Sequence, residues 1–456
     1  MNGRVVNAPV IRRAVGIVVG LVVSVSVAGP RSVTVVAAEP RSVSGVVPLP
    51  AVAPPEDVDA PARKTSAGLP WLQLRLPVVA LPGMTASAPA TTAATLQDIR
   101  QINADGFGTA SNKYAFSMAV FNGDLYVGTL NVDSLQGMLN FFWCRSAAGL
   151  TEGAEIWRYG RDGTWTRVVD DGLASRLNLG VRKLAVIGEL LYAVTANHDE
   201  GMEVWRTRDG SDWERVAAGG FGDCCNTSGR GLCEFAGWIY VGTENRRHGA
   251  QLWRSRDGRA WQKVCDKGIE DAGNVWLSDF TVFDGRLYMG TLNTGGLQLY
   301  RTADGSAIER VKLEGVDTTT DIAALKLCVF KGRMFVGTMD FLRGFDLYAT
   351  ADGDRFRRVM RNGFNDRLNA YCWQLQEYQG RLYAGTYNHH LPVPFGEFTL
   401  LSSADGDEWL VEDEAAFGNA WQYGVRTMTV LDDRLIIGTA TARHACKVFE
   451  ARGLHR

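Results

Sequence analysis

The chain has 456 residues, of which 46% are hydrophobic and 10% aromatic, and its formal net charge is −2 at pH 7. This length supplies a large core, and the balanced charge argues against a nucleic-acid partner. The 51 glycines and 13 tryptophans are typical of β structure with many tight turns.

The first 38 residues predict an export signal. Three arginines, Arg4, Arg12 and Arg13, precede an apolar run, and small residues surround a candidate cleavage site at 36–38. A retained N-terminal membrane anchor is the alternative, although the apolar run is short for one. We therefore expect an exported protein that is extracellular, periplasmic or bound to the cell surface.

Residues 39–96 are rich in Pro, Ala, Val, Ser and Thr and keep no helical or strand period. This composition predicts a disordered linker between the signal and the folded domain.

A repeated unit organises residues 97–453. The line "FNGDLYVGTLN" recurs with variations, and its threonines are Thr129, Thr195, Thr243, Thr291, Thr338, Thr386 and Thr439. Each unit, typically about 48 residues long, reads as four short strands with an Asp-Gly turn between the last two. In the second unit we expect strands at 182–188, 190–196, 202–208 and 213–217. Four antiparallel strands per repeat predict an all-β, seven-bladed β-propeller.

The ring is predicted to close through the N-terminus. The seventh unit supplies only three strands, and "IRQINADGFG" near the N-terminus matches "WERVAAGGFG" of the second unit. An N-terminal strand at about 97–108 therefore completes the last blade and removes the open sheet edges.

The turns "SRDGRAW" and "TRDGSDW" resemble the Asp-box, or BNR, repeats of secreted β-propellers. The resemblance spans about 99–453 and implies the fold but no particular function. That group includes sialidases, yet this chain lacks an Arg-Ile-Pro stretch and its turn is one residue shorter. Sialidase activity is therefore disfavoured.

One face of the propeller is the candidate functional face. If the strands of a blade are named a to d, the long and varied b–c and d–a loops share one face, and binding sites concentrate on such loops. The b–c loops carry the propeller histidines, which are His198, His248, His389, His390 and His444. A further b–c insertion at 132–150 is expected to be a lid, a partner contact or a plug over the channel mouth.

Arginines add a basic signal to this face. Arg182, Arg230 and Arg426 occupy the same repeat position at the start of strand a, and Arg246 lies in a b–c loop. Such a rim suits a carboxylate or sulfate, which guanidinium groups bind bidentately. In the alternative, the arginines form ion pairs with loop carboxylates such as Glu244. Strand alternation also predicts that the side chains of Arg182 and its equivalents point between neighbouring blades and not into the central channel.

Aromatic side chains gather in the sixth and seventh units, where flat rings beside imidazole groups suit a sugar. The predicted ligand-binding residues are His198, Arg230, Arg246, His248, Trp373, Tyr387, His389, His390, Trp421, Tyr423, Arg426 and His444. By contrast, asparagines that recur in nearly every unit, such as Asn178 and Asn197, are predicted to cap turns.

The eight cysteines form no CxxC or CxxH pair, so we predict no metal site and no cofactor. An even number in an exported chain permits disulfides, and a Cys225–Cys265 link is conceivable. Free, buried cysteines are the alternative.

Two functions remain open. The first is a monomeric, non-catalytic propeller that binds a glycan or protein ligand and meets a membrane only through the possible N-terminal anchor. The second is a polysaccharide-active enzyme, a lyase on acidic sugars. There His389, His390 and Tyr371 would act as acid and base while arginine neutralises the carboxylate.

Overall fold

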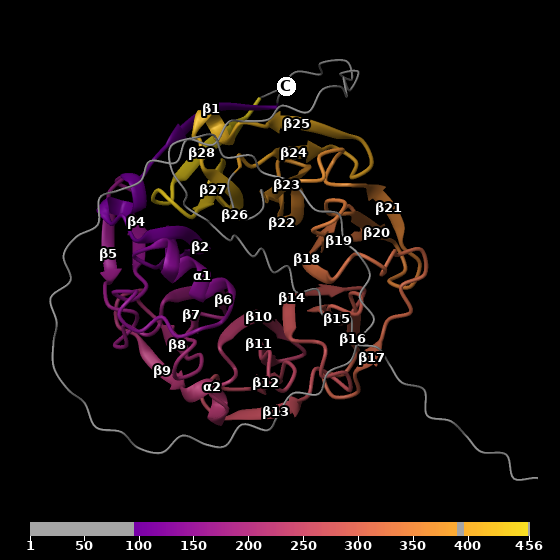
Figure 1. The fold of residues 1–456 in the computed structure, drawn as a ribbon, viewed down its shortest axis with the longest axis horizontal. Coiled ribbons are helices and arrows are strands. Elements are labelled where there is room, and N and C mark those ends of the chain that lie inside the picture. The colour runs from indigo at the N-terminus through magenta and orange to yellow at the C-terminus, as the bar shows by residue number, and fades with distance from the viewer. Residues whose placement is uncertain (1–94, 390–395, 455–456) are drawn as a thin grey trace, which may run out of the picture. The chain divides into compact units, whose positions relative to one another are not determined.

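The computed structural model describes residues 95–389 and 396–454, which form a ring of antiparallel strands (Figure 1). The predicted export signal, nearly all of the linker and His390 lie outside the described residues. Within the described ranges, no helix is long and apolar enough to cross a membrane. The all-β class and the closed antiparallel propeller are confirmed.

The strands form successive groups of four, which we call blades 1 to 7 and whose strands we name a to d. Strands a are β2 (Asn112–Phe121), β6 (Gly180–Ile187), β10 (Ser228–Phe235), β14 (Trp276–Phe283), β18 (Ala323–Phe330), β22 (Asn369–Tyr378) and β26 (Gln422–Leu431). Strands b are β3 (Asp124–Asn131), β7 (Leu190–Ala196), β11 (Trp238–Glu244), β15 (Arg286–Leu292), β19 (Arg333–Met339), β23 (Arg381–Asn388) and β27 (Arg434–Thr441).

The outer half of each blade is shorter. Strands c are β4 (Ile156–Tyr159), β8 (Val204–Thr207), β12 (Leu252–Ser255), β16 (Leu299–Thr302), β20 (Leu347–Thr350), β24 (Leu400–Ser403) and β28 (Val448–Gly453). Strands d are β5 (Trp165–Val169), β9 (Glu214–Ala217), β13 (Trp261–Cys265), β17 (Glu309–Arg310), β21 (Arg357–Met360), β25 (Trp409–Asp413) and, for blade 7, β1 (Leu96–Gln101). The short helical segments are η1 (Asp105–Gly108), α1 (Leu135–Phe142), α2 (Gly219–Gly222) and η2 (Ala416–Gly418).

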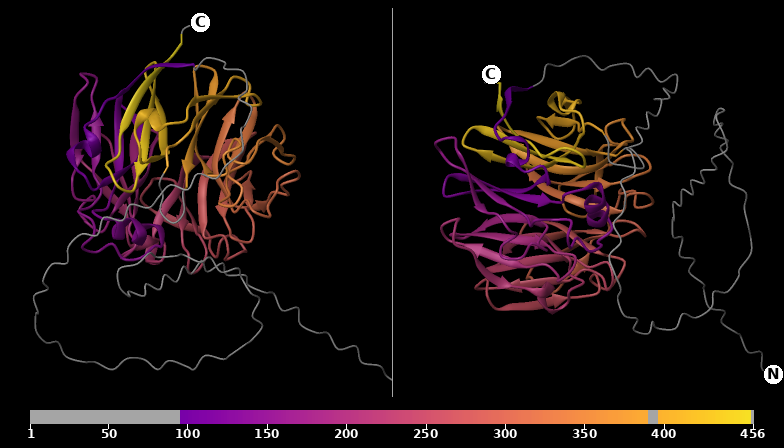
Figure 2. Two further views of the ribbon diagram at one scale, coloured as in Figure 1. Left: turned by 45° about the horizontal axis from the view of Figure 1, so that its top comes forward. Right: turned by 60° about the vertical axis from the view of Figure 1, so that its left-hand side comes forward.

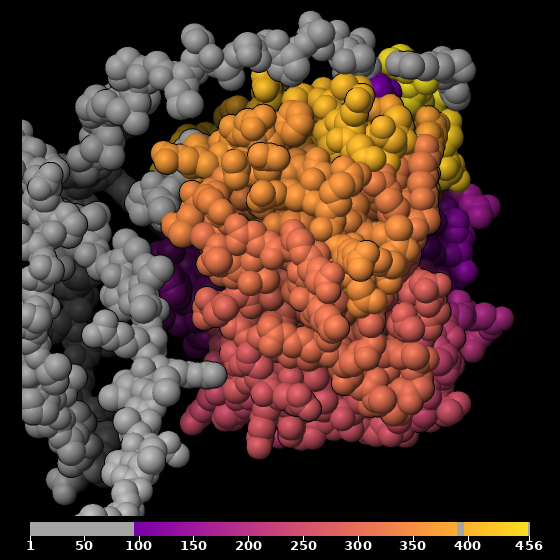
Figure 3. Space-filling model, turned by 90° about the vertical axis from the view of Figure 1, so that its right-hand side faces the viewer, coloured from indigo at the N-terminus to yellow at the C-terminus, as the bar shows by residue number. Residues whose placement is uncertain are grey.

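Strands a lie nearest the centre of the ring, where consecutive ones contact one another from β2 round to β26 and back to β2. The strands run between the two faces of the ring, so the b–c and d–a loops gather on one face (Figure 2). On the outer rim near β17 and β21, side chains of successive blades pack as one continuous surface (Figure 3). The functional face predicted from the sequence therefore exists as a single face of the ring.

The N-terminal strand closes the ring as expected, but it is shorter than predicted. β1 pairs antiparallel with β28, and Arg100 forms an ion pair with Glu450. The strand ends at Gln101, and the rest of the predicted segment contains the tight turn η1. Gly106 and Phe107 adopt positive φ there, which takes the backbone out of the extended region.

A β-bulge interrupts the pairing of strand a with strand b in every blade. The pairing register shifts at one shared position in every inner strand, and β2, β22 and β26 have a second shift nearer their start. The residues left without a partner at the shared position, which we call the bulge ring, are Phe116, Arg182, Arg230, Ser278, Asp279, Leu325, Trp373 and Arg426. A bulge frees a residue from the ladder and redirects its side chain. The arginines noted in the sequence are members of this ring.

The recurrent asparagines are structural, as predicted. In blade 2, the Asn178 side chain donates to the Gly172 carbonyl, and its oxygen accepts hydrogen bonds from Thr195 (3.1 Å) and Asn197 (3.1 Å). The same bonds recur in blade 3 around Asn226. These buried bonds tie strand a to the end of strand b and satisfy polar groups that water cannot reach.

Blade 5 carries Asp321 where the other blades keep an amide. Burial raises the pKa of Asp321 to about 7, and Asp346 and Asp340 act in the same direction. Its oxygens accept from Thr338 (2.6 Å) and Tyr348 (3.1 Å). Because the folded-state pKa lies above the ordinary value of 3.8, the native state holds a proton that the unfolded chain releases. Stability therefore falls as pH rises from about 4 to about 7.

We expect Asp321→Asn to raise the free energy of unfolding at pH 8 by about 2 kcal/mol, and this gain should vanish near pH 4. In blade 4 the corresponding Asn274 donates to the Tyr300 hydroxyl at 3.1 Å, so Tyr348 can accept from an amide in the same way. Denaturant unfolding across this pH range measures the effect.

The control is Asp352→Asn, because backbone N–H donors lower the pKa of Asp352 to about 2. This substitution should destabilise the protein at neutral pH. A gain for Asp321→Asn that does not depend on pH would contradict the prediction.

Candidate functional site

The bulge ring and the neighbouring loops build a cluster of side chains at the b–c/d–a end of the ring's centre. We call it the axial cluster, and it consists of Tyr114, Phe116, Phe141, Arg182, Arg230, Glu244, Arg246, Trp276, Tyr371, Trp373, Tyr387, Tyr423 and Arg426. These residues come from six different blades, so the closed ring itself brings them together.

Two arginines flank one phenylalanine across three blades. The guanidinium carbon of Arg182 lies 4.7 Å from the centre of the Phe116 ring, and that of Arg426 lies 4.6 Å from it. Arg426 also lies 5.1 Å from Trp373. These contacts join members of the bulge ring to one another around the centre. Arg182 of blade 2 and Arg426 of blade 7 thus both contact a side chain of blade 1, the blade that lies between them.

Arg230 and Arg246 share a single carboxylate. Glu244, at the end of β11, accepts hydrogen bonds from Arg230 at 2.7 Å and from Arg246 at 2.8 Å. Arg230 also lies 3.4 Å from the Trp276 ring. Burial acts to raise the pKa of Glu244, but Arg230 and Arg246 outweigh it and hold the pKa well below its ordinary value. The predicted alternative, pairing with Glu244, holds for these two arginines.

The other two arginines keep no carboxylate partner among the described residues. Burial, together with repulsion from Arg230 and Arg426, lowers the pKa of Arg182 well below its ordinary value. The pKa of Arg426 falls to about 9 through burial and repulsion from Arg230, and its Nε has no hydrogen-bond partner among the described groups. The axial cluster thus holds four guanidinium groups and one carboxylate, which leaves uncompensated positive charge.

A second charged group lies in the same central region. Lys183 of blade 2 donates to Asp279 of blade 4 at 3.1 Å, and Lys326 of blade 5 lies 2.9 Å from the same carboxylate. The two lysines outweigh the effect of burial and lower the pKa of Asp279 to about 2. This group adds further net positive charge, and nothing in the sequence pattern had indicated it.

Of the aromatic residues predicted from blades 6 and 7, four are brought together, and Trp421 is not among them. Tyr371 stacks on Tyr387 with ring centres 4.3 Å apart, and Trp373 lies 5.0 Å from Tyr387. Tyr423 exchanges a hydrogen bond of 2.5 Å with Tyr114. Burial raises the pKa values of these tyrosines, so their hydroxyls stay protonated at neutral pH.

One predicted histidine joins this aromatic group. The Tyr387 hydroxyl lies 2.8 Å from Nδ1 of His389, and Phe341 packs edge-on against the His389 ring at 5.2 Å. The neighbouring His390 lies outside the described residues. His389 is therefore placed beside a protonated phenol at the edge of the axial cluster.

The insertion at 132–150 packs against the axial cluster through Phe141. Its helix α1 starts at the N-cap Ser134, and Phe141 lies 6.0 Å from Tyr114 and 5.8 Å from His198. Cys144 anchors the far end by donating to Glu244 at 3.0 Å. Burial lowers the pKa of His198, whose Nδ1 lies 3.2 Å from the Arg145 carbonyl oxygen.

The remaining predicted residues lie in two other groups on this face. In blade 7, Trp421 contacts the His444 ring at 6.5 Å and the Arg443 guanidinium at 4.9 Å. In blade 3, His248 lies 3.4 Å from Asp223. The predicted set is therefore real as a face, but it does not form one site.

The surface hollows of the ring lie on the opposite face. One is lined by turns of blades 2 and 3, including Gly188, Glu189, Gly237 and Asp257, and a neighbouring one includes Asn122. Their walls are turn backbone and an exposed Arg208–Glu189 ion pair. The first hollow is also lined by Glu234 and Arg256.

All eight cysteines are free, so the conceivable Cys225–Cys265 disulfide is wrong. The side chain of Cys265 packs against the apolar interior of blade 3, whereas Cys225 lies in the loop before β10.

Comparisons with known proteins show no family for this chain. The chain matches no protein-family model, and the comparison with curated proteins gave no match. Similar solved structures include a GH74 enzyme from Niastella koreensis, with 15% identity over 67% of this chain and 46% of that one at a TM-score of 0.44. The propeller domain of the Trilobed protease from Pyrococcus furiosus has 10% identity over 76% of this chain and 97% of that one, with a TM-score of 0.44.

The SapL1 lectin, solved with alpha methyl fucoside, has 13% identity over 67% of this chain and 97% of the lectin, with a TM-score of 0.43. The chain spans less than half of the length of the GH74 enzyme. At these identities the likeness concerns the propeller fold alone.

We expect Glu244→Gln to destabilise the protein by about 3 kcal/mol, because removing one partner of a buried ion pair leaves charges without compensation. Arg230 would lose its partner while its side chain stays only 7% exposed. Chemical denaturation at pH 7 measures the loss. The control Glu200→Gln, in the exposed b–c loop of blade 2, should change stability little. Equal effects of the two substitutions would contradict this account of the axial cluster.

Proposed function

We propose that the protein binds an anionic glycan, one bearing carboxylate or sulfate groups, at the axial cluster. The observation that carries this proposal is the pair Arg182 and Arg426, which flank Phe116 without a carboxylate partner among the described residues. Repulsion among neighbouring guanidinium groups makes this arrangement costly in the absence of an anion. An anionic group would remove that cost and accept bidentate hydrogen bonds.

The aromatic residues of the axial cluster support the proposal that the anionic group belongs to a sugar. The rings of Tyr371, Trp373 and Tyr387 lie beside the arginines, and Tyr371 and Trp373 are only partly buried. Aromatic faces pack against the C–H faces of sugar rings, while hydroxyl and imidazole groups bind their hydroxyls. An exported protein, as the N-terminal segment predicts, would meet acidic polysaccharides outside the cytoplasm.

Helix α1 limits the path by which such a ligand can enter the axial cluster. Phe141 covers Tyr114 and Phe116, so a ligand that reaches Arg182 has to pass beside α1 or displace it. The exposed side of α1 carries Leu135, Leu139 and Trp143, of which Trp143 is 65% exposed. In this proposal α1 acts as a lid over the anion site.

We expect the purified protein to bind polygalacturonate or chondroitin sulfate and not a neutral polysaccharide, with affinity that falls as salt is added. Arg182→Ala and Arg426→Ala should each weaken binding roughly tenfold or more, because a hydrogen bond to a charged group contributes about 1.5 to 3 kcal/mol. Isothermal titration calorimetry measures both effects.

The matched control is Arg208→Ala, since Arg208 is 72% exposed and pairs with Glu189 on the opposite face. It should bind like the unaltered protein. Equal affinity for neutral and acidic polysaccharides, or unchanged binding by both axial arginine variants, would contradict the proposal.

Lyase activity on the same acidic glycans is the second candidate, and the hydrogen bond between Tyr387 and His389 favours it. Burial keeps the Tyr387 hydroxyl protonated, so it can serve as an acid while the imidazole of His389 takes a proton. In β-elimination a base removes the proton next to the carboxylate, an acid protonates the leaving oxygen, and arginine stabilises the charge on the carboxylate. Arg230 and Arg246 lie close enough to Tyr371 to affect its titration.

If the protein is a lyase, incubation with polygalacturonate should produce unsaturated sugars that absorb in the ultraviolet. His389→Ala and Tyr387→Phe should each lower the rate roughly 100-fold or more, which is the typical contribution of acid–base catalysis. His444→Ala provides the control, because His444 lies beside Trp421 in blade 7. If the protein binds these polysaccharides without any change in absorbance, the non-catalytic function is retained and lyase activity on these substrates is excluded.

A further inference from the structure

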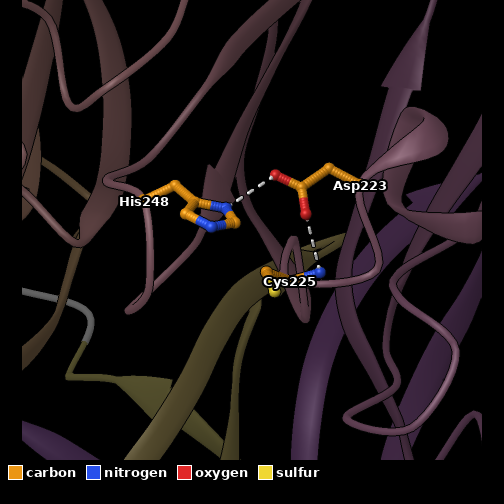
Figure 4. A group of neighbouring side chains, drawn as sticks. All are labelled: Asp223, Cys225 and His248. Atoms are coloured by element: carbon orange, nitrogen blue, oxygen red, sulfur yellow. Dashed lines mark hydrogen bonds and ion pairs between the residues drawn. The ribbon is translucent and has the colours of Figure 1, made fainter.

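Three side chains of blade 3 gather on the rim of the functional face (Figure 4). Asp223 and Cys225 come from the d–a loop between β9 and β10, and His248 comes from the b–c loop between β11 and β12. One carboxylate oxygen, the thiol sulfur and one imidazole nitrogen all lie within 4.8 Å of one another. Within the described part of the chain, this is the one group of three such side chains that could hold a metal ion.

Asp223 also stabilises the d–a loop through hydrogen bonds, and the equivalent aspartate of blade 4 makes the same bonds. Asp223 accepts hydrogen bonds from Asn245 (3.0 Å), Gln251 (3.1 Å) and the backbone N–H of Cys225 (3.0 Å). In blade 4, Asp271 accepts the same three kinds of bond. The carboxylate is therefore held in place by the repeat, whether or not a metal is present.

The hydrogen bonds of this loop do not require a thiol at position 225 or an imidazole at position 248. At the corresponding positions of blade 4 stand Gly273 and Gly295, and the same hydrogen bonds to the aspartate form there without a thiol or an imidazole. The thiol and the imidazole are thus additions of blade 3 to a turn that folds without them. The His248 ring points toward a carboxylate oxygen of Asp223, which it reaches at 3.4 Å, and the Cys225 sulfur lies within 4.8 Å of the carboxylate and imidazole ligand atoms.

The geometry points to a metal site for a borderline divalent cation such as Zn²⁺, with Asp223, Cys225 and His248 as ligands. Thiolate, imidazole and carboxylate are the ligands that Zn²⁺ takes in proteins, and three protein ligands leave a fourth position for water or an external ligand. A carboxylate has about four acceptor positions, so Asp223 can keep its hydrogen bonds and bind the ion as well. The side chains of His248 and Asp223 are 52% and 25% exposed, which leaves the site accessible from solvent.

The test uses the full-length chain and Co²⁺ as a spectroscopic probe for Zn²⁺. We expect one equivalent of Co²⁺ to produce the absorbance of a thiolate–cobalt bond, and Zn²⁺ to displace it. Cys225→Ser should abolish that absorbance, and His248→Ala should weaken binding at least tenfold. Both substitutions keep the hydrogen bonds that hold the backbone of the turn, because Cys225 and His248 make those bonds through their own N–H groups. His248→Ala removes in addition only the 3.4 Å contact of the imidazole with Asp223.

Two matched controls isolate the site. His444 follows Thr441 as His248 follows Asn245, and each donates its backbone N–H to that side chain, so His444→Ala should bind Co²⁺ normally. Cys224→Ser removes the adjacent exposed thiol and should also retain the absorbance. No thiolate absorbance from the unaltered chain, or an absorbance that persists in Cys225→Ser, would overturn the proposal. Equal loss of affinity in His444→Ala and His248→Ala would overturn it as well.

Discussion

A bulge in the innermost strand of each blade is the constraint on which the axial site depends. A regular strand turns alternate side chains to opposite sides, and the inner strands of this ring use that alternation to fill the spaces between blades. The bulge adds one residue that the ladder does not pair, and the backbone bonds around it do not depend on the side chain. The same position can therefore carry phenylalanine, arginine, leucine or tryptophan in different blades without changing the fold.

The fold and the site consequently use different residues of the same repeat. Hydrogen bonds such as those of Asn178 and Asn226 recur from blade to blade, stay buried and hold the strand ends together. Residues that only some blades carry, such as Arg426 and Glu244, supply the charge. A ring closed by β1 gives each inner strand a neighbour on both sides, which keeps the bulged side chains close to one another. Without that closure, Arg182 and Arg426 could not meet on the two sides of Phe116.

The period of the repeat was sufficient to predict the strands, their order and the closing strand, because these depend on local turns and hydrophobic alternation. It could not reveal the bulge, because every blade has the bulge and the length of the repeat therefore does not show it. Phe116 could have been found, because it occupies the repeat position of the arginines. The helix α1 and the blade 3 cluster were missed for another reason. Asp223 and His248 lie 25 residues apart in different loops, and no short motif joins them.

The b–c loop of blade 3 contributes residues both to the axial cluster and to the group formed by Asp223, Cys225 and His248. Glu244 and Arg246 face the axial cluster, whereas His248 of the same loop faces Asp223 on the rim. Asn245 stands between them and fixes the loop by accepting the backbone N–H of His248 at 2.8 Å. A cation held at the rim and an anion held at the axis would thus act on opposite ends of one short, rigid segment.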